Sequence, residues 1–279
     1  MIKYELIPEQ LIHEGLITKN SLISPEMIDE ELILLTHNKS YWERLRDLSL
    51  SESEIRRSGF PLSAELIQRE CIIAQGTVLG SLHALNHGIA FNVAGGTHHA
   101  GSNWAEGFCL LNDQAISANY LLYNNLANRI LIIDLDVHQG NGTAEIFRDD
   151  QRVFTFSMHG EKNFPFRKEQ SDLDIGLNDG TGDMEYLSLL KKNLNFILES
   201  FEPNFIFYLA GVDVLETDKL GKLNLTISGC KERDFIVLEQ CRNLKIPVQI
   251  SMGGGYSPKI SDIIEAHCNT YRIAYDLYF

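Results

Sequence analysis

The sequence lacks several features that would assign the protein to an extracellular or membrane-bound class. Its five cysteines are odd in number and contain no Cys-x-x-Cys pair, which argues against a disulfide framework and against a sulfur-ligated zinc site. No apolar run approaches the ~18 residues that span a membrane, and the first residues lack the apolar stretch of a signal peptide. We therefore expect a cytoplasmic protein that does not bind membranes.

Basic residues are also scarce. The chain has 24 Lys and Arg against 38 Asp and Glu, a net charge of −14, and no Lys/Arg-rich block. This balance argues against direct nucleic-acid binding and would mildly favour cationic substrates such as lysine-bearing segments. No linker, repeat or low-complexity tract divides the 279 residues, of which 44% are hydrophobic. We predict one domain over residues 1–279.

Five apolar runs end abruptly in polar or glycine-rich residues, and helical patterns lie between them. Apolar residues recur at three and four positions over 187–201 and 235–244, which predicts helices. Alternation of strands and helices predicts an α/β fold with a mainly parallel sheet and helices on both faces. Ligands then bind beyond the carboxyl ends of the strands, where the five runs end, at 89–93, 130–133, 153–156, 205–209 and 247–250.

The most informative run is 130–133, because Asp134, Asp136 and His138 follow it. An isolated Asp-x-Asp more often caps a helix, but two carboxylates beside an imidazole form a set that zinc accepts. A catalytic zinc typically keeps three protein ligands and one open position. Asp213, which follows the run 205–209 after Gly211, is our candidate for the third ligand. The pattern predicts a metal site that activates water.

Two further strand ends carry groups that could transfer protons. His98 and His99 follow a Gly-Gly turn, and since adjacent imidazoles do not both protonate easily, one of them can act as a base. Tyr256 follows Gly253-Gly254-Gly255 and can hydrogen-bond an oxyanion. Alone, each motif is more often a cap or a turn; beside the metal cluster, they favour an active site.

Together these stretches resemble the zinc-dependent histone deacetylases of the arginase/deacetylase fold, and most closely the class IV-like bacterial members. The resemblance runs from about residue 32 to the C-terminus. It is carried by Gly-Gly-Thr-His-His-Ala (95–100), Glu-Gly-Phe-Cys-Leu-Leu-Asn-Asp (106–113), Asp-Leu-Asp-Val-His-Gln-Gly-Asn-Gly (134–142), Ala-Gly-Val-Asp (210–213) and Gly-Gly-Gly-Tyr (253–256).

The resemblance implies a hydrolase that removes acetyl or longer acyl groups from lysine side chains of proteins or peptides. Zinc would be held by Asp136, His138 and Asp213. His99 would be the general base and His98 its electrostatic or acid partner. The remaining roles are implied in the same way: Tyr256 would polarise the amide carbonyl, Asp134 would orient His98 and bind a potassium-like cation with Ser157, and Gly107, Phe108, Phe164, Leu220 and Gly254 would contact substrate.

The chain departs from the family pattern in two places. Asn141 stands where most members place a second aspartate behind the second histidine, and a neutral amide raises the basicity of His99 less than a carboxylate. With Gln139, this signature is shared with enzymes that prefer long fatty acyl chains. Family members also carry a first strand before the counterpart of Lys3-Tyr4, so we expect the chain from Met1 to leave a sheet edge uncovered.

Two alternative functions remain open. An acetylpolyamine deacetylase would share the metal site, but polyamine-specific members tend to carry an acidic residue where this chain has Leu220, which disfavours polyamines. A metal-bearing protein that binds acyl-lysine without hydrolysing it would be expected to lack Tyr256 or a metal ligand, and none is missing.

Overall fold

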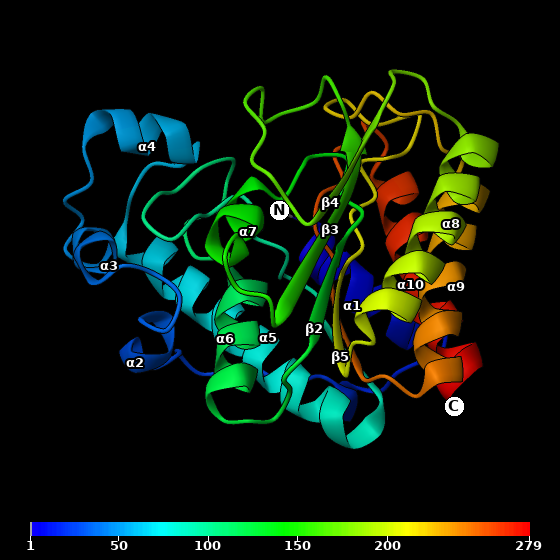
Figure 1. Cartoon of the computed structure of the whole chain (residues 1–279), viewed down its shortest axis with the longest axis horizontal. Helices are drawn as coiled ribbons and strands as arrows, with labels where there is room; N and C mark the ends of the chain where they lie inside the picture. Colours follow the sequence, from blue (N-terminus) through cyan, green and yellow to red (C-terminus); the bar gives the residue numbers. More distant parts are fainter. Residues whose placement is uncertain (1) are drawn as a thin grey trace.

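The structure, a computed structural model, describes residues 2–279 as an α/β domain around a six-stranded sheet. All neighbouring strands are parallel, in the order β1-β6-β5-β2-β3-β4. In Figure 1 the sheet stands near the centre of the molecule with helices on either side. The strands are β1 (Ile89–Asn92), β2 (Ile130–Asp134), β3 (Val153–Gly160), β4 (Leu173–Leu177), β5 (Phe205–Leu209) and β6 (Val248–Ser251).

Strand β2 lies inside the sheet, between β5 and β3. All five of its residues are buried, which explains why its sequence is a continuous apolar run rather than an alternating one. Its last residue, Asp134, is in register with Leu209 of β5 and Ser157 of β3. The chain that leaves β2 therefore enters the middle of the edge where the parallel strands end.

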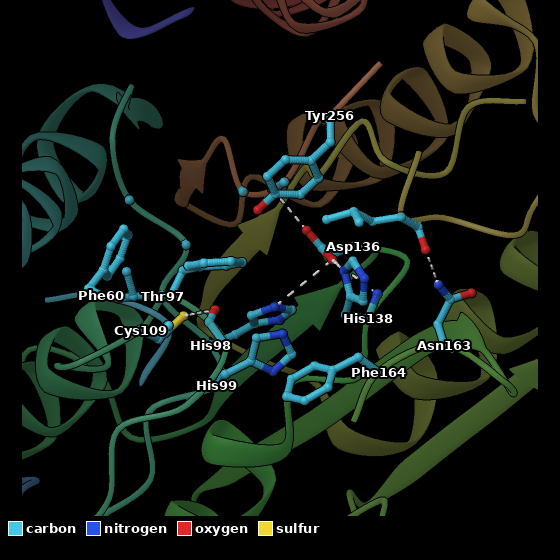
Figure 2. Close-up of a pocket in the computed structure, with 18 of the residues that line it drawn as sticks. Phe60, Thr97, His98, His99, Cys109, Asp136, His138, Asn163, Phe164 and Tyr256 are labelled. Carbon is cyan, nitrogen blue, oxygen red and sulfur yellow. Dashed lines mark hydrogen bonds and ion pairs between the residues drawn. The ribbon is translucent and has the colours of Figure 1, made fainter. Parts of the chain in front are cut away.

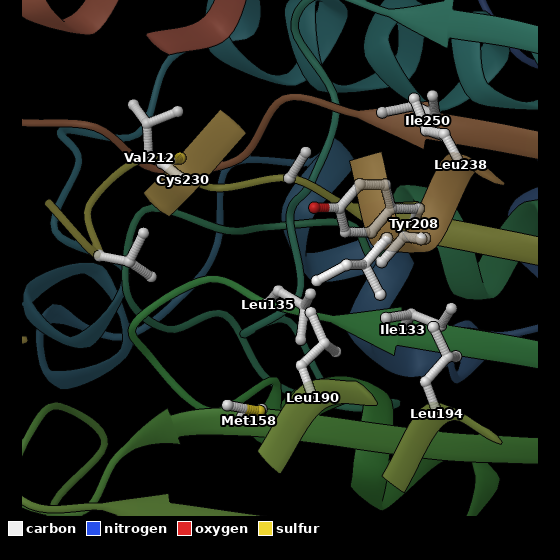
Figure 3. Packing of buried hydrophobic residues seen from close by; sticks show 14 of the residues in the cluster. Ile133, Leu135, Met158, Leu190, Leu194, Tyr208, Val212, Cys230, Leu238 and Ile250 are labelled. Carbon is white, nitrogen blue, oxygen red and sulfur yellow. The ribbon is translucent and has the colours of Figure 1, made fainter. Parts of the chain in front are cut away.

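One face of the sheet is covered by α8 (Asp183–Phe201), α9 (Ile227–Leu244) and α10 (Ile260–Tyr278). Their apolar sides pack on the strands, as Figure 3 shows for Leu190 and Leu194 of α8 beside Ile133 and Tyr208. The other face is covered by α5 (Ala64–His87), α6 (Asp113–Tyr123) and α7 (Asn141–Phe147). The predicted two-sided covering is confirmed.

Shorter elements surround this three-layer centre. Helix α1 (Lys3–His13) packs against α10. Helices α2 (Glu30–Ile33), α3 (Lys39–Arg46) and α4 (Glu52–Ser58) form an outer layer beside α5 and α6, and η1 (Lys19–Ser21) is one turn of 3₁₀-helix. No helix among residues 2–279 is long and apolar enough to cross a membrane.

The element boundaries differ from the predicted ones where pairing or capping extends them. Strand β3 continues to Gly160 instead of stopping at Phe156, because β4 pairs with it from Phe156 onward. Strand β4 was not predicted; its residues are mostly half-exposed, so it lacks an apolar run. Helix α9 begins eight residues before the predicted 235, at Ile227, where the Thr226 side chain caps the Gly229 N–H. Strand β1 forms one edge of the sheet, and the family's additional first strand stays a prediction.

Candidate active site

Four segments that follow strands β1, β2, β5 and β6 meet at one end of the sheet. They bring His98 and His99, Asp136 and His138, Asp213, and Tyr256 to one cavity or its base. Figure 2 shows His98, His99 and Phe164 on one side of Asp136 and His138, with Tyr256 on the other. The predicted convergence of separate strand ends is therefore present in the structure.

The candidate metal ligands form a compact buried set. One donor atom from each of Asp136, His138 and Asp213 lies within 4.8 Å of the others. The His138 Nδ1 atom is 2.9 Å from Asp136 Oδ1 and 3.2 Å from Asp213 Oδ2. Backbone N–H groups bind the remaining carboxylate oxygens: Gly254 N donates to Asp136 Oδ2 at 2.8 Å, and Val137 N to Asp213 Oδ1 at 2.9 Å.

This donor set fits a divalent cation. Asp213 Oδ2 is buried and accepts no hydrogen bond within residues 2–279. Burial raises the pKa of Asp213 to about 7, and the nearby Asp136 carboxylate contributes to the rise. Two carboxylates buried this closely are costly without a compensating charge. Their oxygens and an imidazole nitrogen are ligands that zinc accepts.

His98 is held by a carboxylate. Its Nδ1 donates to Asp134 Oδ2 at 2.6 Å, and its Nε2 lies 3.9 Å from Asp136 Oδ1. Burial by itself would lower the pKa of His98, but the Asp134 carboxylate outweighs burial and raises it to about 9. The structure thus places Asp134 where the resemblance implies that it orients His98.

His99 is held by an amide instead. Its Nδ1 lies 2.7 Å from Asn141 Oδ1, and its ring centroid is 4.0 Å from that of His98. Burial lowers the pKa of His99 well below 6.5, and the charges of His98 and His138 lower it further. The two adjacent imidazoles are therefore driven in opposite directions, which is the arrangement that separates an acid from a base.

Tyr256 is fixed through its backbone. Its N–H donates to Asp218 Oδ2 at 2.6 Å, and burial, followed by the charge of Asp213, raises the pKa of its phenol. The phenol consequently stays a hydrogen-bond donor. The adjacent glycine turn is held by Lys3 of α1, whose Nζ donates to Gly253 O at 2.8 Å. Burial lowers the pKa of Lys3 to about 8.

A cavity of about 450 Å³ leads to these groups. Gly107, Phe108, Phe164, Leu220 and Gly254, the predicted substrate contacts, all line it. The Phe164 ring meets the His99 ring edge-on at 5.0 Å, while Phe108 and Leu220 are exposed at the mouth. The aromatic walls are the kind of surface that binds an apolar stem.

Glycine is required at one wall of the cavity for two reasons. Gly107 has φ +54°, and a Cβ there would lie 2.6 Å from the His99 ring and 2.9 Å from the Phe164 ring. Any larger residue would push the wall into the His99 imidazole or into the opposite aromatic ring. The sequence motif Gly107-Phe108 thus sets the width of the cavity.

The side chains around the cavity are more basic than the net charge of the chain led us to expect. Among the described residues that line the cavity, Arg57, Arg69, Lys162 and Lys222 are basic, and the buried Asp136 is the one acid. Arg57, Arg69 and Lys162 have carboxylate partners in Glu106, Glu70 and Asp179, but none of these three carboxylates lines the cavity. Composition averages over the whole surface, so it did not report the charge around one cavity.

Asp134 and Ser157, the candidate monovalent-cation residues, are neighbours in register across β2 and β3. Both carboxylate oxygens of Asp134 accept hydrogen bonds, from His98 and from the Asp136 N–H. The Ser157 hydroxyl lies 3.0 Å from Nδ1 of His159, which is buried in β3 and does not line the cavity.

Sequence reasoning missed several residues that contact the site. Lys3, Asp218 and Glu106 each hold a group described above through one hydrogen bond. Their signal in the sequence is weak, because each lies outside the strand-end clusters that drew attention to the others. Glu106 does offer one signal, because it is the first residue of the stretch 106–113 that resembles the family.

Comparison with known proteins agrees with this geometry. A sequence model of the histone deacetylase domain matches residues 1–271. The chain is 43% identical to an uncharacterized protein from Picosynechococcus sp. over 100% of this chain and 93% of that protein. It is 31% identical to human histone deacetylase 1, covering 95% of this chain and 57% of the human protein.

Solved structures show the same fold. A crystal structure of an HDAC homologue from Aquifex aeolicus superposes with a TM-score of 0.82 at 28% identity, covering 95% of this chain and 76% of that one. The HD domain of HDA15 matches in fold with a TM-score of 0.79 at 21% identity. The chain belongs to the histone deacetylase family and has its arginase/deacetylase fold. The family implies hydrolytic deacetylation by a metal-dependent enzyme.

Proposed function

We propose that the protein is a zinc-dependent amidohydrolase that removes acetyl or longer acyl groups from lysine side chains. The observation that carries the proposal is the buried set of Asp136, His138 and Asp213 at the base of a cavity walled by Phe108 and Phe164. A lysine stem is narrow and apolar, so it suits these walls and presents its amide to the metal ligands.

The residues around the metal ligands would divide the proton transfers. Bound zinc would supply a Lewis acid that polarises the amide carbonyl and makes water more acidic. His99, neutral because of its lowered pKa, accepts a proton from the attacking water. His98, held cationic by Asp134, offers charge or a proton as the C–N bond breaks and the lysine amine leaves. The Tyr256 hydroxyl donates to the carbonyl oxygen.

A monovalent cation, potassium by resemblance, would bind beside Asp134 and Ser157. These residues pair across β2 and β3 directly behind His98. A cation there would support the carboxylate that holds His98 in position.

Two observations favour acyl-lysine over acetylpolyamines. The cavity mouth carries Leu220 rather than an acidic residue, and Lys162 and Lys222 line it as well. A second cationic amine on the substrate would approach Lys222 with like charge, and Lys162 as well, although Asp179 lies 3.8 Å from the Lys162 ammonium. The acyl-lysine binder without turnover finds less support, because the acid, base and oxyanion donor all surround the metal ligands.

The test measures bound zinc per chain and fluorophore release from acetyl- and longer acyl-lysine peptides, with acetylpolyamines in parallel. Asp213→Asn should lower both zinc occupancy and turnover strongly, because it removes a charged ligand. The matched control Asp47→Asn changes an exposed aspartate at the end of α3 and should alter neither. Stoichiometric zinc in the unchanged protein without hydrolysis of any peptide would favour the binding protein, and preference for acetylpolyamines would favour that enzyme.

A further inference from the structure

A hydrogen-bonded chain runs from His99 to the surface through a residue that sequence reasoning did not select. His99 Nδ1 lies 2.7 Å from Asn141 Oδ1, and Asn141 Nδ2 donates to Glu106 Oε2 at 2.7 Å. The other Glu106 oxygen, Oε1, accepts from Arg57 Nε at 2.9 Å. The Glu106 side chain is only 16% exposed. A carboxylate thus stands one amide away from His99.

The donors and acceptors in this chain permit one arrangement. The carboxylate of Glu106, paired with Arg57, can only accept hydrogen bonds. Asn141 must therefore turn its NH₂ group toward Glu106, which leaves its Oδ1 facing His99. An amide oxygen can only accept, so His99 Nδ1 must carry the proton. In a neutral imidazole the other nitrogen, Nε2, is then the free base.

Glu106 is itself held firmly. Its backbone N–H donates to Cys109 O at 3.0 Å, and the next residue, Gly107, donates to Arg57 O at 3.3 Å. Arg57 also lies over the Trp104 ring at 5.3 Å, and Trp104 Nε1 donates to His99 O at 3.2 Å. The end of α4 and the loop before the cavity wall therefore fix the carboxylate relative to both His99 and Asn141.

We propose that Glu106 is a positioning residue that sets the Asn141 amide and, through it, the tautomer of His99. This inference rests on the proposed function, in which His99 is the base. Glu106 supplies the negative charge that an aspartate at position 141 would supply directly. Asn141 and Glu106 thus act together on His99, although Glu106 lies 35 residues earlier in the chain.

Glu106→Gln removes the negative charge and adds a hydrogen-bond donor without changing the size of the side chain. A glutamine at this position must turn its NH₂ group toward either Asn141 or Arg57, both of which present donors to it. If Asn141 rotates to satisfy it, its own NH₂ faces His99 and favours the wrong tautomer. We expect kcat to fall roughly 10- to 100-fold, as for other residues that orient a site through a neighbour. KM, zinc content and melting temperature should change little.

Asn141→Asp alone should also be impaired to a similar degree, since it places two carboxylates in direct contact. The double variant Glu106→Gln/Asn141→Asp again gives each hydrogen-bonding group from Arg57 to His99 a partner. The introduced glutamine accepts from Arg57 and donates to the introduced aspartate, which in turn accepts from His99. We therefore expect the double variant to recover to within about threefold of the unchanged enzyme. Independent effects would multiply instead and leave it roughly 100-fold or more below.

The experiment measures kcat and KM on an acetyl-lysine peptide for the four proteins of this cycle, with Glu52→Gln as control. Glu52 is an exposed glutamate paired with Arg56, and its variant should match the unchanged enzyme. Long-range ¹H–¹⁵N spectra of the zinc-loaded proteins should show His99 protonated at Nδ1 in the unchanged and double forms, and altered in Glu106→Gln.

Multiplicative losses, or an unaltered tautomer in Glu106→Gln, would overturn the assignment of Glu106 while leaving an active deacylase. An unchanged enzyme that binds zinc and hydrolyses no acyl-lysine peptide is a different result, because it overturns the proposed function and this inference with it.

Discussion

Gly254→Ala tests how closely the glycine turn supports the metal ligands. Gly254 donates its N–H to Asp136 Oδ2 at 2.8 Å, and unlike Gly253 and Gly255 it does not have a positive φ. Alanine therefore adds no backbone strain at this position. The whole effect must come from the added Cβ, which would lie 2.0 Å from Asp213 Oδ2 and 2.7 Å from Asp136 Oδ2.

Ordinary van der Waals contact begins at 3.4 Å, so the Cβ and the Asp213 oxygen must separate by about 1.4 Å (3.4 less 2.0). Asp213 is fully buried and its other oxygen is held by Val137 N, so it has little room to retreat. A displacement of about 1 Å in a site costs on the order of 10²-fold in rate. We expect zinc affinity to fall about 10- to 100-fold and turnover to fall further.

Zinc affinity is measured by competition with a chelating dye, and turnover at saturating zinc on an acetyl-lysine peptide. Gly182→Ala is the matched control, because Gly182 has φ −104° and the nearest atom to its added Cβ is Asn224 O at 3.6 Å. The control should keep its zinc affinity. Unchanged zinc affinity and turnover in Gly254→Ala would refute the placement of the metal between these carboxylates.

Three further predictions concern the donor, the pH and the acyl chain. Tyr256→Phe should keep zinc and fold but lose roughly 10²–10³ in kcat; a parallel loss of zinc would make the tyrosine structural. Burial outweighs the hydrogen bonds to the Gly101 and Ser102 backbone and lowers the pKa of His37 to about 4, against 6.5 when unfolded. The unfolded state therefore binds a proton more readily, so this stability is present above pH 6.5 and is lost as the pH falls toward 4, by about 2 kcal/mol between pH 7 and 5. In His37→Gln the free energy of unfolding, measured with urea, should depend less on pH over that range. The same pH dependence in both proteins would contradict this. Finally, octanoyl- or longer acyl-lysine peptides should be cleaved at least as efficiently as acetyl-lysine, since burying even four of the additional methylenes could raise kcat/KM up to roughly a hundredfold. A steep fall in kcat/KM from acetyl through butyryl to octanoyl would exclude an open acyl site.

Much of the site was determined by sequence because its chemistry is local. Asp136 and His138 come from one strand end, where ligands of parallel sheets bind, and two carboxylates beside an imidazole are a set of metal ligands that spacing alone reveals. The glycine run before Tyr256 was readable for a similar reason, since a specific chain conformation restricts the residue type. The Gly107-Phe108 pair was implied only by the resemblance to the family. The parallel sheet followed from the alternation of strand and helix patterns.

Tertiary structure decided whatever depends on distant partners. Strand β4 forms because β3 offers it an edge, and its half-exposed sequence gave no apolar run. Lys3 reaches Gly253 from 250 residues away, and the basic residues at the cavity mouth come from several separate segments although the whole chain is acidic. The chain from Glu106 through Asn141 to His99 exists only in the fold, because a hydrogen bond requires its donor and acceptor within about 3 Å of each other, and sequence spacing does not report that distance.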